Sequence, residues 1–320
     1  MLSVPTSAYH PDLRRSVRAG RAVTWMARRT WGLRVMQRFM MQPMVGNEIE
    51  GVINDQIMIP STTTPGHSIR TRIYKPSDST GPLPVMLYAH GGGYQVGVPE
   101  QAHAFFEALL TRRDVAIVAP AYRLTLAGNP YPAGLDDCVD AIQYVKANAA
   151  ELGFRDDRYM LAGHSAGGGM TAALTHRIVD SEAADIAFQM PVYPMLDHRM
   201  QTESSQLSGT AVWDTRSNAD AWERYVGHLG GEVPEYASPA LRSDVTALPP
   251  TISWVGDIEP FKDEVIAYID KLDAAGIDTR FMVFEGGYHG FEHLATKADL
   301  SREATEFEAD AFADFYDRYL

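Results

Sequence analysis

The sequence is poor in cysteine and in positive charge, and it contains no long apolar run. Its single cysteine, Cys138, excludes an intramolecular disulfide and gives no sign of an oxidising compartment. A net charge of −13 argues against nucleic acid as a partner, because phosphate-binding surfaces carry a basic excess. No stretch approaches the roughly 20 apolar residues that span a bilayer, and arginines interrupt the N-terminus where a secretory signal has its apolar core. We therefore expect a cytoplasmic protein.

The first 46 residues differ from the rest of the chain in charge. They hold eight arginines and one acidic residue, Asp12, for a net charge of +7, so the remainder carries −20. Residues 12–42 place apolar residues among the arginines at helical spacing, which predicts one or two helices. Such a stretch either lies on a membrane surface or folds back over the acidic body, where its methionines and aromatic residues line an apolar cavity. We favour the second alternative and do not expect membrane association.

Strand and helix patterns alternate along the rest of the chain. Strands are expected in the apolar run before Ser165 and at 55–60, 67–74, 84–89, 115–119, 188–193, 251–255 and 280–284. Helices are expected after Ser165 and at 101–113, 133–150, 261–275 and 301–319. This order predicts an α/β fold with a mainly parallel sheet covered on both faces, because strand-helix-strand crossovers are right-handed. The first two strands are expected to form an antiparallel edge.

Residues 195–238 interrupt this alternation. The stretch is rich in polar residues, and it carries Trp213, Trp222 and Tyr225 at a spacing compatible with helices. We interpret it as an insertion above the strand ends. A chain of 320 residues that is 45% hydrophobic can bury a large core, so one α/β domain with such an elaboration is favoured over two equal domains.

Ser165 lies in the sequence Gly163-His-Ser-Ala-Gly167, between an apolar run and a helical pattern. Glycines two residues on either side let the backbone turn sharply from strand to helix and raise the serine hydroxyl above the sheet edge. The first N–H groups and the positive dipole end of the following helix lie where negative charge develops during acyl transfer. This motif alone is weak support for catalysis, because glycine-rich turns also serve packing.

A serine nucleophile needs a base, and the base needs an orienting carboxylate, both on loops after later strands. His289 follows the strand at 280–284, in a loop where glycines free the backbone to place an imidazole. The carboxylate is expected in the loop after 251–255, where Glu259 is favoured over Asp257, and Asp257 over Asp263.

His90-Gly91-Gly92-Gly93 directly follows a buried strand. Because glycine has no β-carbon, these backbone N–H groups can approach a ligand closely. Together with the N–H of Ala166, they are candidates to hold the anionic oxygen of a tetrahedral intermediate.

The sequence resembles the hormone-sensitive lipase family of α/β-hydrolases, which includes the bacterial family IV esterases. The resemblance covers most of the chain from about Pro76 to the end. It rests on His90-Gly-Gly-Gly93, Ala121-Tyr-Arg-Leu124, Tyr131-Pro-Ala-Gly-Leu-Asp136, Gly163-His-Ser-Ala-Gly-Gly168, Val192-Tyr-Pro194, Tyr236-Ala-Ser-Pro239, Glu259-Pro-Phe-Lys-Asp263 and His289-Gly-Phe291.

This resemblance implies an α/β-hydrolase fold: a mostly parallel eight-stranded sheet with helices on both faces and a helical cap. The core is expected at 51–194 and 239–320. The cap is expected to combine residues 1–50 with the insertion at 195–238.

The resemblance also implies a serine carboxylesterase for short- to medium-chain esters, a small-molecule substrate, with no cofactor and no metal. Its triad would be Ser165, Glu259 and His289, and its oxyanion hole Gly92, Gly93 and Ala166. Substrate contacts are expected from Tyr94, His164, Trp213 and Trp222, and apolar contacts to the acyl chain from Trp25, Trp31, Met36, Phe39 and Met40. A homodimer is left open.

The chain departs from the family pattern at four places. His164 stands before the nucleophile where the family usually has Asp, and Ala121 stands where it has Asp before Tyr-Arg-Leu. Thr125-Leu-Ala replaces Ala-Pro-Glu, and the acid of the family is more often Asp than Glu. These departures bear on substrate preference and loop geometry more than on the reaction class.

Other functions fit the sequence less well than this interpretation. His289-Gly-Phe-Glu292-His293 matches the H-x-x-E-H zinc signature, but the glycine weakens a helix there and no third ligand suggests itself. The glycine patterns lack the residues of nucleotide-binding loops. The gibberellin receptor and plant dehydratases resemble the same family, so ligand binding, dehydration and acyl transfer to an alcohol are alternatives. Intact Ser165 and His289 favour ester hydrolysis.

Overall fold

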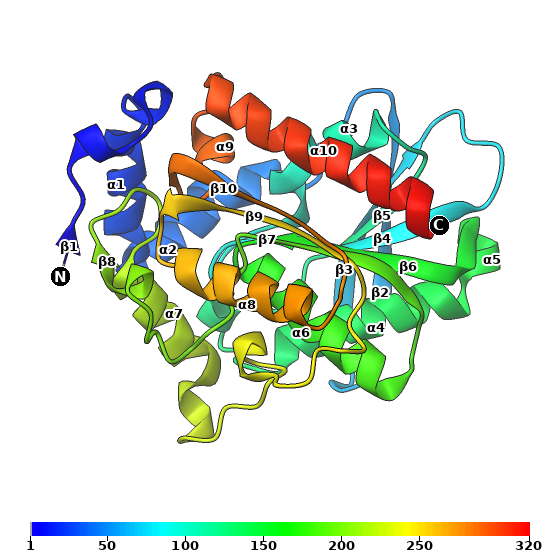
Figure 1. Cartoon of the computed structure of the whole chain (residues 1–320). Helices are drawn as coiled ribbons and strands as arrows, with labels where there is room; N and C mark the ends of the chain where they lie inside the picture. The colour runs from blue at the N-terminus through cyan, green and yellow to red at the C-terminus, as the bar shows by residue number, and fades with distance from the viewer. Residues whose placement is uncertain (1) are drawn as a thin grey trace.

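The computed structural model describes residues 2–320, and its centre is a mostly parallel sheet of eight strands (Figure 1). The strand order is β10-β9-β7-β6-β4-β5-β3-β2. Strand β2 is antiparallel to β3, β3 is antiparallel to β5, and the remaining pairs are parallel. The strands are β2 (Val52–Pro60), β3 (Ser68–Pro76), β4 (Leu83–Ala89), β5 (Ala116–Pro120), β6 (Phe154–His164), β7 (Ile186–Val192), β9 (Thr251–Ile258) and β10 (Thr279–Tyr288). The predicted sheet and its antiparallel edge are confirmed.

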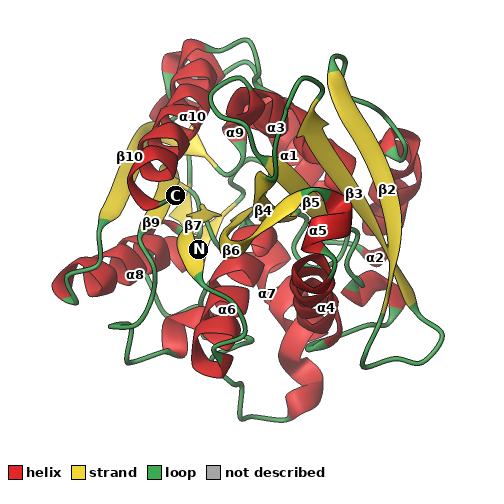
Figure 2. Cartoon of the chain, turned by 90° about the vertical axis from the view of Figure 1, so that its right-hand side faces the viewer, coloured by secondary structure: helices red, strands yellow, loops and turns green. Residues whose placement is uncertain are grey.

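Helices cover both faces of the sheet, as the alternation of patterns predicts. Figure 2 shows α3 (His103–Leu110) and α10 (Asp299–Tyr319) on one face, with α4 (Ala133–Ala147), α6 (Ala166–Ser181) and α8 (Lys262–Ala274) on the other. Two short helices, α5 (Ala149–Leu152) and α9 (Phe291–Leu294), complete this set. The helix expected at 133–150 divides at Asn148, whose backbone leaves the helical conformation.

The central strands are buried on both faces, which explains their continuous apolar sequences. In β4, Val85 and Leu87 pack into the core beneath α4 and α6, whereas Met86 and Tyr88 pack toward α3 and α10. Because side chains alternate along a strand, one apolar strand thus supplies two cores. The sheet is therefore a rigid base for the loops at its carboxyl edge.

The N-terminal segment and residues 195–238 pack against each other at that edge. The segment contains β1 (Leu2–Ser3), α1 (Val17–Ala27) and α2 (Thr30–Met36), and the insertion contains β8 (Leu207–Ser208) and α7 (Thr215–Val226). Strands β1 and β8 pair in parallel, and Thr24 Oγ1 donates to the carbonyl oxygen of Thr210 at 2.8 Å. Figure 1 shows these elements together at one end of the molecule. We call this assembly the cap layer.

A glycine allows the two parts of the cap layer to approach closely. A β-carbon on Gly20 would lie 2.6 Å from the β-carbon of Ala211, which is closer than such atoms come, so α1 can meet the insertion here only through glycine. Within residues 2–320, no helix has both the length and the apolar character needed to cross a membrane.

Candidate active site

Ser165 occupies a sharp, strained turn between β6 and α6. Its φ of 59° and ψ of −122° are unusual for a residue with a side chain. Two glycines permit this turn: a β-carbon on Gly163 would lie 2.3 Å from the carbonyl oxygen of Gly167, and one on Gly167 would lie 2.0 Å from that of Ala89. The turn therefore packs directly against neighbouring backbone, and it raises the Ser165 hydroxyl above the edge of the sheet.

His289 lies directly after β10 and faces Ser165. Its Nε2 is 2.8 Å from Ser165 Oγ. Strand β10 extends beyond the predicted 280–284 to Tyr288, which pairs with Ile258 after a register shift. Gly286 lies in this shift with a φ of 71°, and the bulge re-aims the strand end so that the imidazole reaches the serine. Tyr193 and Phe261 each meet the imidazole edge to face, with ring centroids 5.0 Å away.

Glu259 is the carboxylate that reaches the imidazole. Its Oε2 pairs with His289 Nδ1, and its Oε1 accepts a hydrogen bond from the N–H of Gly256 at 3.3 Å. Its side chain is buried. Burial raises the pKa of Glu259 above its ordinary value, while the neighbouring His289 opposes this shift. A carboxylate in this position fixes the tautomer of the imidazole and stabilises its cation.

The other two candidate carboxylates hold loops in place. Asp257 Oδ1 accepts a hydrogen bond from the N–H of Gly286 at 2.6 Å and so fixes the bulge before His289. Asp263 Oδ2 accepts from the N–H of Ser204 at 2.7 Å, which ties the insertion to α8. The structure thus brings Glu259, and neither aspartate, into contact with His289.

Within residues 2–320, the backbone N–H groups of Gly92, Gly93 and Ala166 donate to no protein acceptor. Ala166 directly follows Ser165, and a β-carbon on Gly91, next to Gly92, would lie 3.5 Å from the β-carbon of Ser165. Gly92 and Gly93 have φ values of 123° and 63°, and a β-carbon on Gly92 would lie 1.8 Å from the carbonyl oxygen of Val96. Only glycine fits this path. Free donors next to a serine hydroxyl can bind a developing oxyanion.

The glycine loop at 91–93 is held in place by His90 and by Tyr122, whose role the sequence did not predict. The rings of His90 and Tyr122 stack with centroids 4.2 Å apart, and the Tyr122 hydroxyl donates to the carbonyl oxygen of His90 at 2.6 Å. Burial lowers the pKa of His90 to about 4, so its ring is neutral at physiological pH. Tyr122, Tyr193 and Phe261 all lie in the quoted motifs, but their packing roles depend on tertiary contacts.

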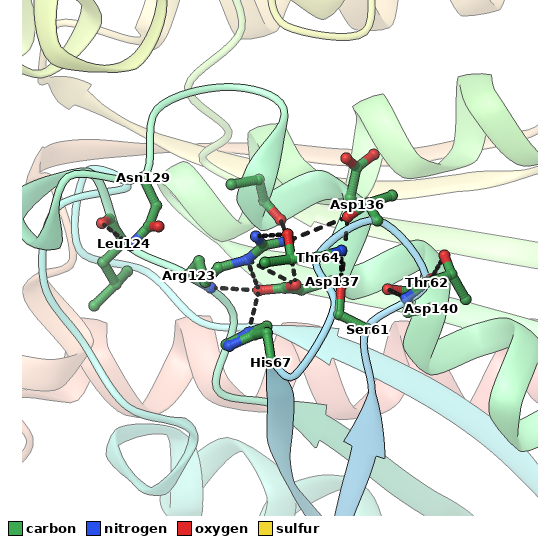
Figure 3. Close-up of polar contacts among 12 residues, drawn as sticks. Ser61, Thr62, Thr64, His67, Arg123, Leu124, Asn129, Asp136, Asp137 and Asp140 are labelled. Carbon is green, nitrogen blue, oxygen red and sulfur yellow. Dashed lines mark hydrogen bonds and ion pairs between the residues drawn. The ribbon is translucent and has the colours of Figure 1, made fainter.

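Arg123, from the same motif as Tyr122, anchors the loop between β5 and α4. Its backbone N–H donates to Asp137 Oδ2 at 2.8 Å, and its Nη1 donates to Thr64 Oγ1 at 2.7 Å. Figure 3 shows Arg123 and Asp137 joining the turn between β2 and β3 to α4. Asp140 extends this contact by accepting from the N–H of Thr62 at 2.9 Å. This part of the motif therefore supports the scaffold and takes no part in the site itself.

The predicted substrate contacts lie at different depths. Trp213 packs over Gly93, where a β-carbon would lie 2.5 Å from the indole, and its ring centroid is 6.4 Å from that of His289. Tyr94 is buried and stacks on Tyr225 at 4.0 Å, with Trp222 beside both. Trp213 thus borders the site directly, while Tyr94 and Trp222 form the layer beneath it.

The assignment of His164 to substrate contact does not fit the structure. Its ring is 2% exposed and points to the other side of the turn, as expected for the neighbour of a residue on a sharp bend. Nδ1 is 3.0 Å from the Tyr88 hydroxyl, and Nε2 is 3.2 Å from Glu308 Oε1. Burial lowers the pKa of His164 to about 4. The histidine that stands here in place of the family's usual aspartate therefore belongs to a buried hydrogen-bond network with Tyr88 and Glu308, beneath the site.

The zinc interpretation of His289-Gly-Phe-Glu292-His293 is also inconsistent with the geometry. His289 uses one nitrogen toward Ser165 and the other toward Glu259. Glu292 and His293 instead approach His164, with the possible donor atoms of these three residues within 4.8 Å of one another. Glu292 already pairs with the Tyr193 hydroxyl. The two histidines of the motif therefore lie in different surroundings: His289 contacts Ser165 and Glu259, and His293 lies near His164.

The apolar residues expected to face the acyl chain lie mostly elsewhere. Met36 is buried, but Trp25, Trp31, Phe39 and Met40 are exposed to solvent on the N-terminal helices. Of the eight arginines in the first 46 residues, Arg28 alone forms an ion pair among the described residues, with Asp214 of the insertion. Helix α1 meets the insertion at Gly20 and through the Thr24 hydroxyl, and its large apolar side chain Trp25 remains exposed.

Comparison with known proteins places this geometry in a family. The chain is 30% identical over 242 residues to the carboxylesterase NlhH of Mycobacterium tuberculosis, covering 74% of this chain and 75% of that protein. It is 26% identical over 254 residues to an ethyl acetate hydrolase of Pseudomonas putida, covering 78% and 80%.

Solved structures agree over nearly the whole chain. The esterase LipW of Mycobacterium marinum matches with a TM-score of 0.85 at 28% identity, covering 97% of each chain. A bacterial heroin esterase matches with a TM-score of 0.84 at 26% identity, covering 97% of this chain and 98% of that one. A family model for the alpha/beta hydrolase fold matches residues 86–293. With the strand order, the nucleophile turn and these matches together, the chain belongs to the alpha/beta hydrolase family.

Proposed function

We propose that this protein is a serine carboxylesterase of the hormone-sensitive lipase type, which hydrolyses short- to medium-chain carboxylic esters. The observation that carries the proposal is the hydrogen-bonded series from Ser165 through His289 to Glu259, set beside three free backbone N–H groups. The names of the relatives, a carboxylesterase and an ethyl acetate hydrolase among them, support the same reaction class. The substrate is a small-molecule ester, and the reaction needs no cofactor.

In the acylation step, Ser165 Oγ attacks the ester carbonyl while His289 Nε2 accepts the hydroxyl proton. The N–H groups of Gly92, Gly93 and Ala166 stabilise the oxyanion that forms. Glu259 holds the other ring nitrogen and stabilises the imidazolium. His289 then donates its proton to the leaving alcohol, and the acyl group remains on Ser165.

In the deacylation step, water takes the place of the alcohol. His289 removes a proton from the water as it attacks the acyl carbonyl, and the same N–H groups stabilise the second oxyanion. The imidazolium then returns the proton to Ser165, which releases the carboxylic acid. The two half-reactions use the same groups in reverse order.

Trp213 supports the preference for short and medium acyl chains. Its indole packs over Gly93 beside His289, so a bulky ring borders the space next to the reacting carbonyl. Pocket shape limits transition-state binding for longer chains. A series of p-nitrophenyl esters from acetate to decanoate should show activity falling with length, and Trp213→Ala should extend the accepted length.

The assignment of the nucleophile is tested by covalent labelling. A fluorophosphonate probe should label Ser165 alone, and Ser165→Ala should abolish both labelling and turnover. Ser181→Ala, at the opposite end of the same helix, serves as the matched control and should retain both. Undiminished turnover by Ser165→Ala, or labelling at another residue, would contradict the proposal. Labelling without turnover of any ester in the series would favour a binding or acyl-transfer function.

A further inference from the structure

The N-terminal helices carry an exposed apolar face on the outside of the cap layer. Phe39 is 72% exposed, Trp31 52% and Trp25 49%, and Met40 and Val35 are also exposed. The rings of Trp25 and Trp31 lie 5.4 Å apart. Trp31, Val35 and Phe39 follow one another at four-residue spacing along α2 and the π-helical turn Gln37–Met41, so they lie on one side. We call this surface the outer face.

The packing of the cap layer does not account for these side chains. The opposite side of the same helices supplies the buried contacts, from Val17, Ala27, Leu33 and Met36. A monomeric protein seldom leaves several large apolar side chains together in water without a partner. The outer face is therefore available for an interaction.

The helices that carry the outer face hold positive charges only. Residues 13–47 contain eight arginines and no acidic residue. Arg18, Arg34 and Arg38 are exposed, and none of them forms an ion pair within residues 2–320. The guanidinium of Arg29 stacks on Trp25 at 4.2 Å. Aromatic rings interleaved with free arginines match a surface that is apolar inside and anionic at its boundary.

We propose that the outer face docks on the surface of a bilayer that contains anionic phospholipids. The aromatic side chains would enter the boundary between headgroups and acyl chains, and the arginines would contact the phosphates. A second copy of this chain fits the face less well, because a symmetric contact would bring two sets of unpaired arginines together. The proposal concerns binding and does not depend on the esterase activity.

The outer face is connected to the loop that follows the oxyanion glycines. The N–H of Gly97 donates to Gln37 Oε1 at 2.8 Å, and the N–H of Gly46 donates to Glu100 Oε1 at 3.0 Å. Docking would therefore hold the carboxyl edge of the sheet near the bilayer.

Binding is tested by sedimentation with vesicles of equal parts phosphatidylglycerol and phosphatidylcholine, and with phosphatidylcholine vesicles alone. The full chain should bind the anionic vesicles, and binding should weaken as NaCl is raised. Tryptophan fluorescence should shift to shorter wavelength on binding. Because Trp213, Trp222 and Trp254 are buried, this shift reports on Trp25 and Trp31.

Matched variants separate the apolar contribution to vesicle binding from the electrostatic one. Phe39→Ser should lower the partition coefficient about tenfold or more, by removing an aromatic ring from the apolar contact. Met58→Ser, at another exposed apolar position, on β2 (53% exposed), should leave it unchanged. Arg34→Glu and Arg38→Glu should each lower it about 20-fold, since each basic residue near an anionic surface contributes about fivefold. Arg216→Glu, an exposed arginine without an ion pair on α7, is the control.

The expected pattern is loss of vesicle binding by the outer-face variants with unchanged hydrolysis of water-soluble p-nitrophenyl acetate. Absence of binding to anionic vesicles by the unaltered chain would overturn the proposal. Equal binding to both kinds of vesicle, or equal losses in the control variants, would also overturn it. Sedimentation equilibrium that shows a dimer, dissociated by Phe39→Ser, with no vesicle binding would assign the face to a second copy instead.

Discussion

Two buried carboxylates, Glu308 in the core and Asp214 in the cap layer, are held in opposite ways. Under the site, Glu308 accepts hydrogen bonds from Trp254 and His164 and contacts no arginine or lysine, and burial raises its pKa to about 7. In the cap layer, burial acts in the same direction on Asp214, but hydrogen bonds from Arg28, Gly209 and Ser217 outweigh it and lower the pKa. Glu308 is thus stabilised as a neutral group, and Asp214 as an anion.

The two carboxylates differ in what surrounds them. Glu308 lies in the core without an arginine or lysine partner among residues 2–320, so burial disfavours its charged form. The cap layer joins two distant segments of chain, and an ion pair with backbone donors can join them without a large apolar core. Changes of charge in the two regions should therefore have different consequences.

The largest effect is expected from Glu259→Gln in the core. Loss of the carboxylate charge leaves the imidazolium unsupported, and turnover should fall by about 10⁴, as for comparable triad substitutions. Asp257→Asn is the matched control, because its side chain contacts Gly286 and not His289. It should cost far less. Steady-state kinetics on one soluble ester measure both variants, and the reverse order would assign the acid to Asp257.

Removal of residues 1–45 should have the next largest effect. The truncation exposes the surface of the insertion that α1 covers and removes the buried residues of the N-terminal helices, so the midpoint of thermal unfolding should fall by more than about 10 °C. Without the cap contacts, the preference among p-nitrophenyl esters of different length should also change. Differential scanning calorimetry and the ester series measure these effects. Unchanged selectivity on soluble esters would contradict a role for this segment in the cap.

Asp214→Asn tests the ion pair of the cap layer. Asparagine keeps an N-cap acceptor for α7 but loses the charge that Arg28 and the backbone donors stabilise, so unfolding at pH 7 should be easier by about 3 kcal/mol. Because the folded-state pKa is lowered, this stabilisation is present above the unfolded-state pKa of about 4 and is lost as the pH falls below it. Denaturant titrations at several pH values should show the variant converging on the unaltered protein at acid pH. Asp220→Asn, on the same helix, should change little at any pH.

Glu308→Gln tests the opposite sign in the core. Because burial raises the pKa of Glu308 to about 7 in the folded protein, stability is retained below the unfolded-state value of about 4 and declines as the pH rises through 7. Glutamine retains the oxygen that accepts from Trp254 and stays neutral, so above pH 8 the variant should be more stable by about 2 kcal/mol. Unfolding midpoints from pH 5 to about 9 measure this difference, with the exposed Glu306→Gln as the control. A variant that is less stable than the unaltered protein at high pH would refute the interpretation that the folded protein favours neutral Glu308.

The sequence predicted the scaffold and the central residues of the site with good accuracy, because both depend on local patterns. Apolar strands alternating with helices dictate a parallel sheet, and the carboxyl ends of parallel strands meet at one edge. The glycine-containing loops that carry Ser165, Gly92 and His289 were therefore expected together, and the structure brings Ser165 and His289 within hydrogen-bonding distance. The order of preference among Glu259, Asp257 and Asp263 followed from the position of Pro260 in the next helical turn, and the structure places Glu259 against His289.

Only the tertiary structure decided which side chains share an environment when they lie far apart in the chain. His164 adjoins the nucleophile in sequence, but the turn directs it toward Glu308, 144 residues away. Arg28 pairs with Asp214, which lies 186 residues away in the chain. Within residues 2–320, the neighbouring arginines of the same basic stretch form no ion pair. The helical pattern of the N-terminal segment determined that one side would be buried. Which side faced the insertion was decided by the close approach at Gly20, because a steric fit between two surfaces is a property of neither sequence alone.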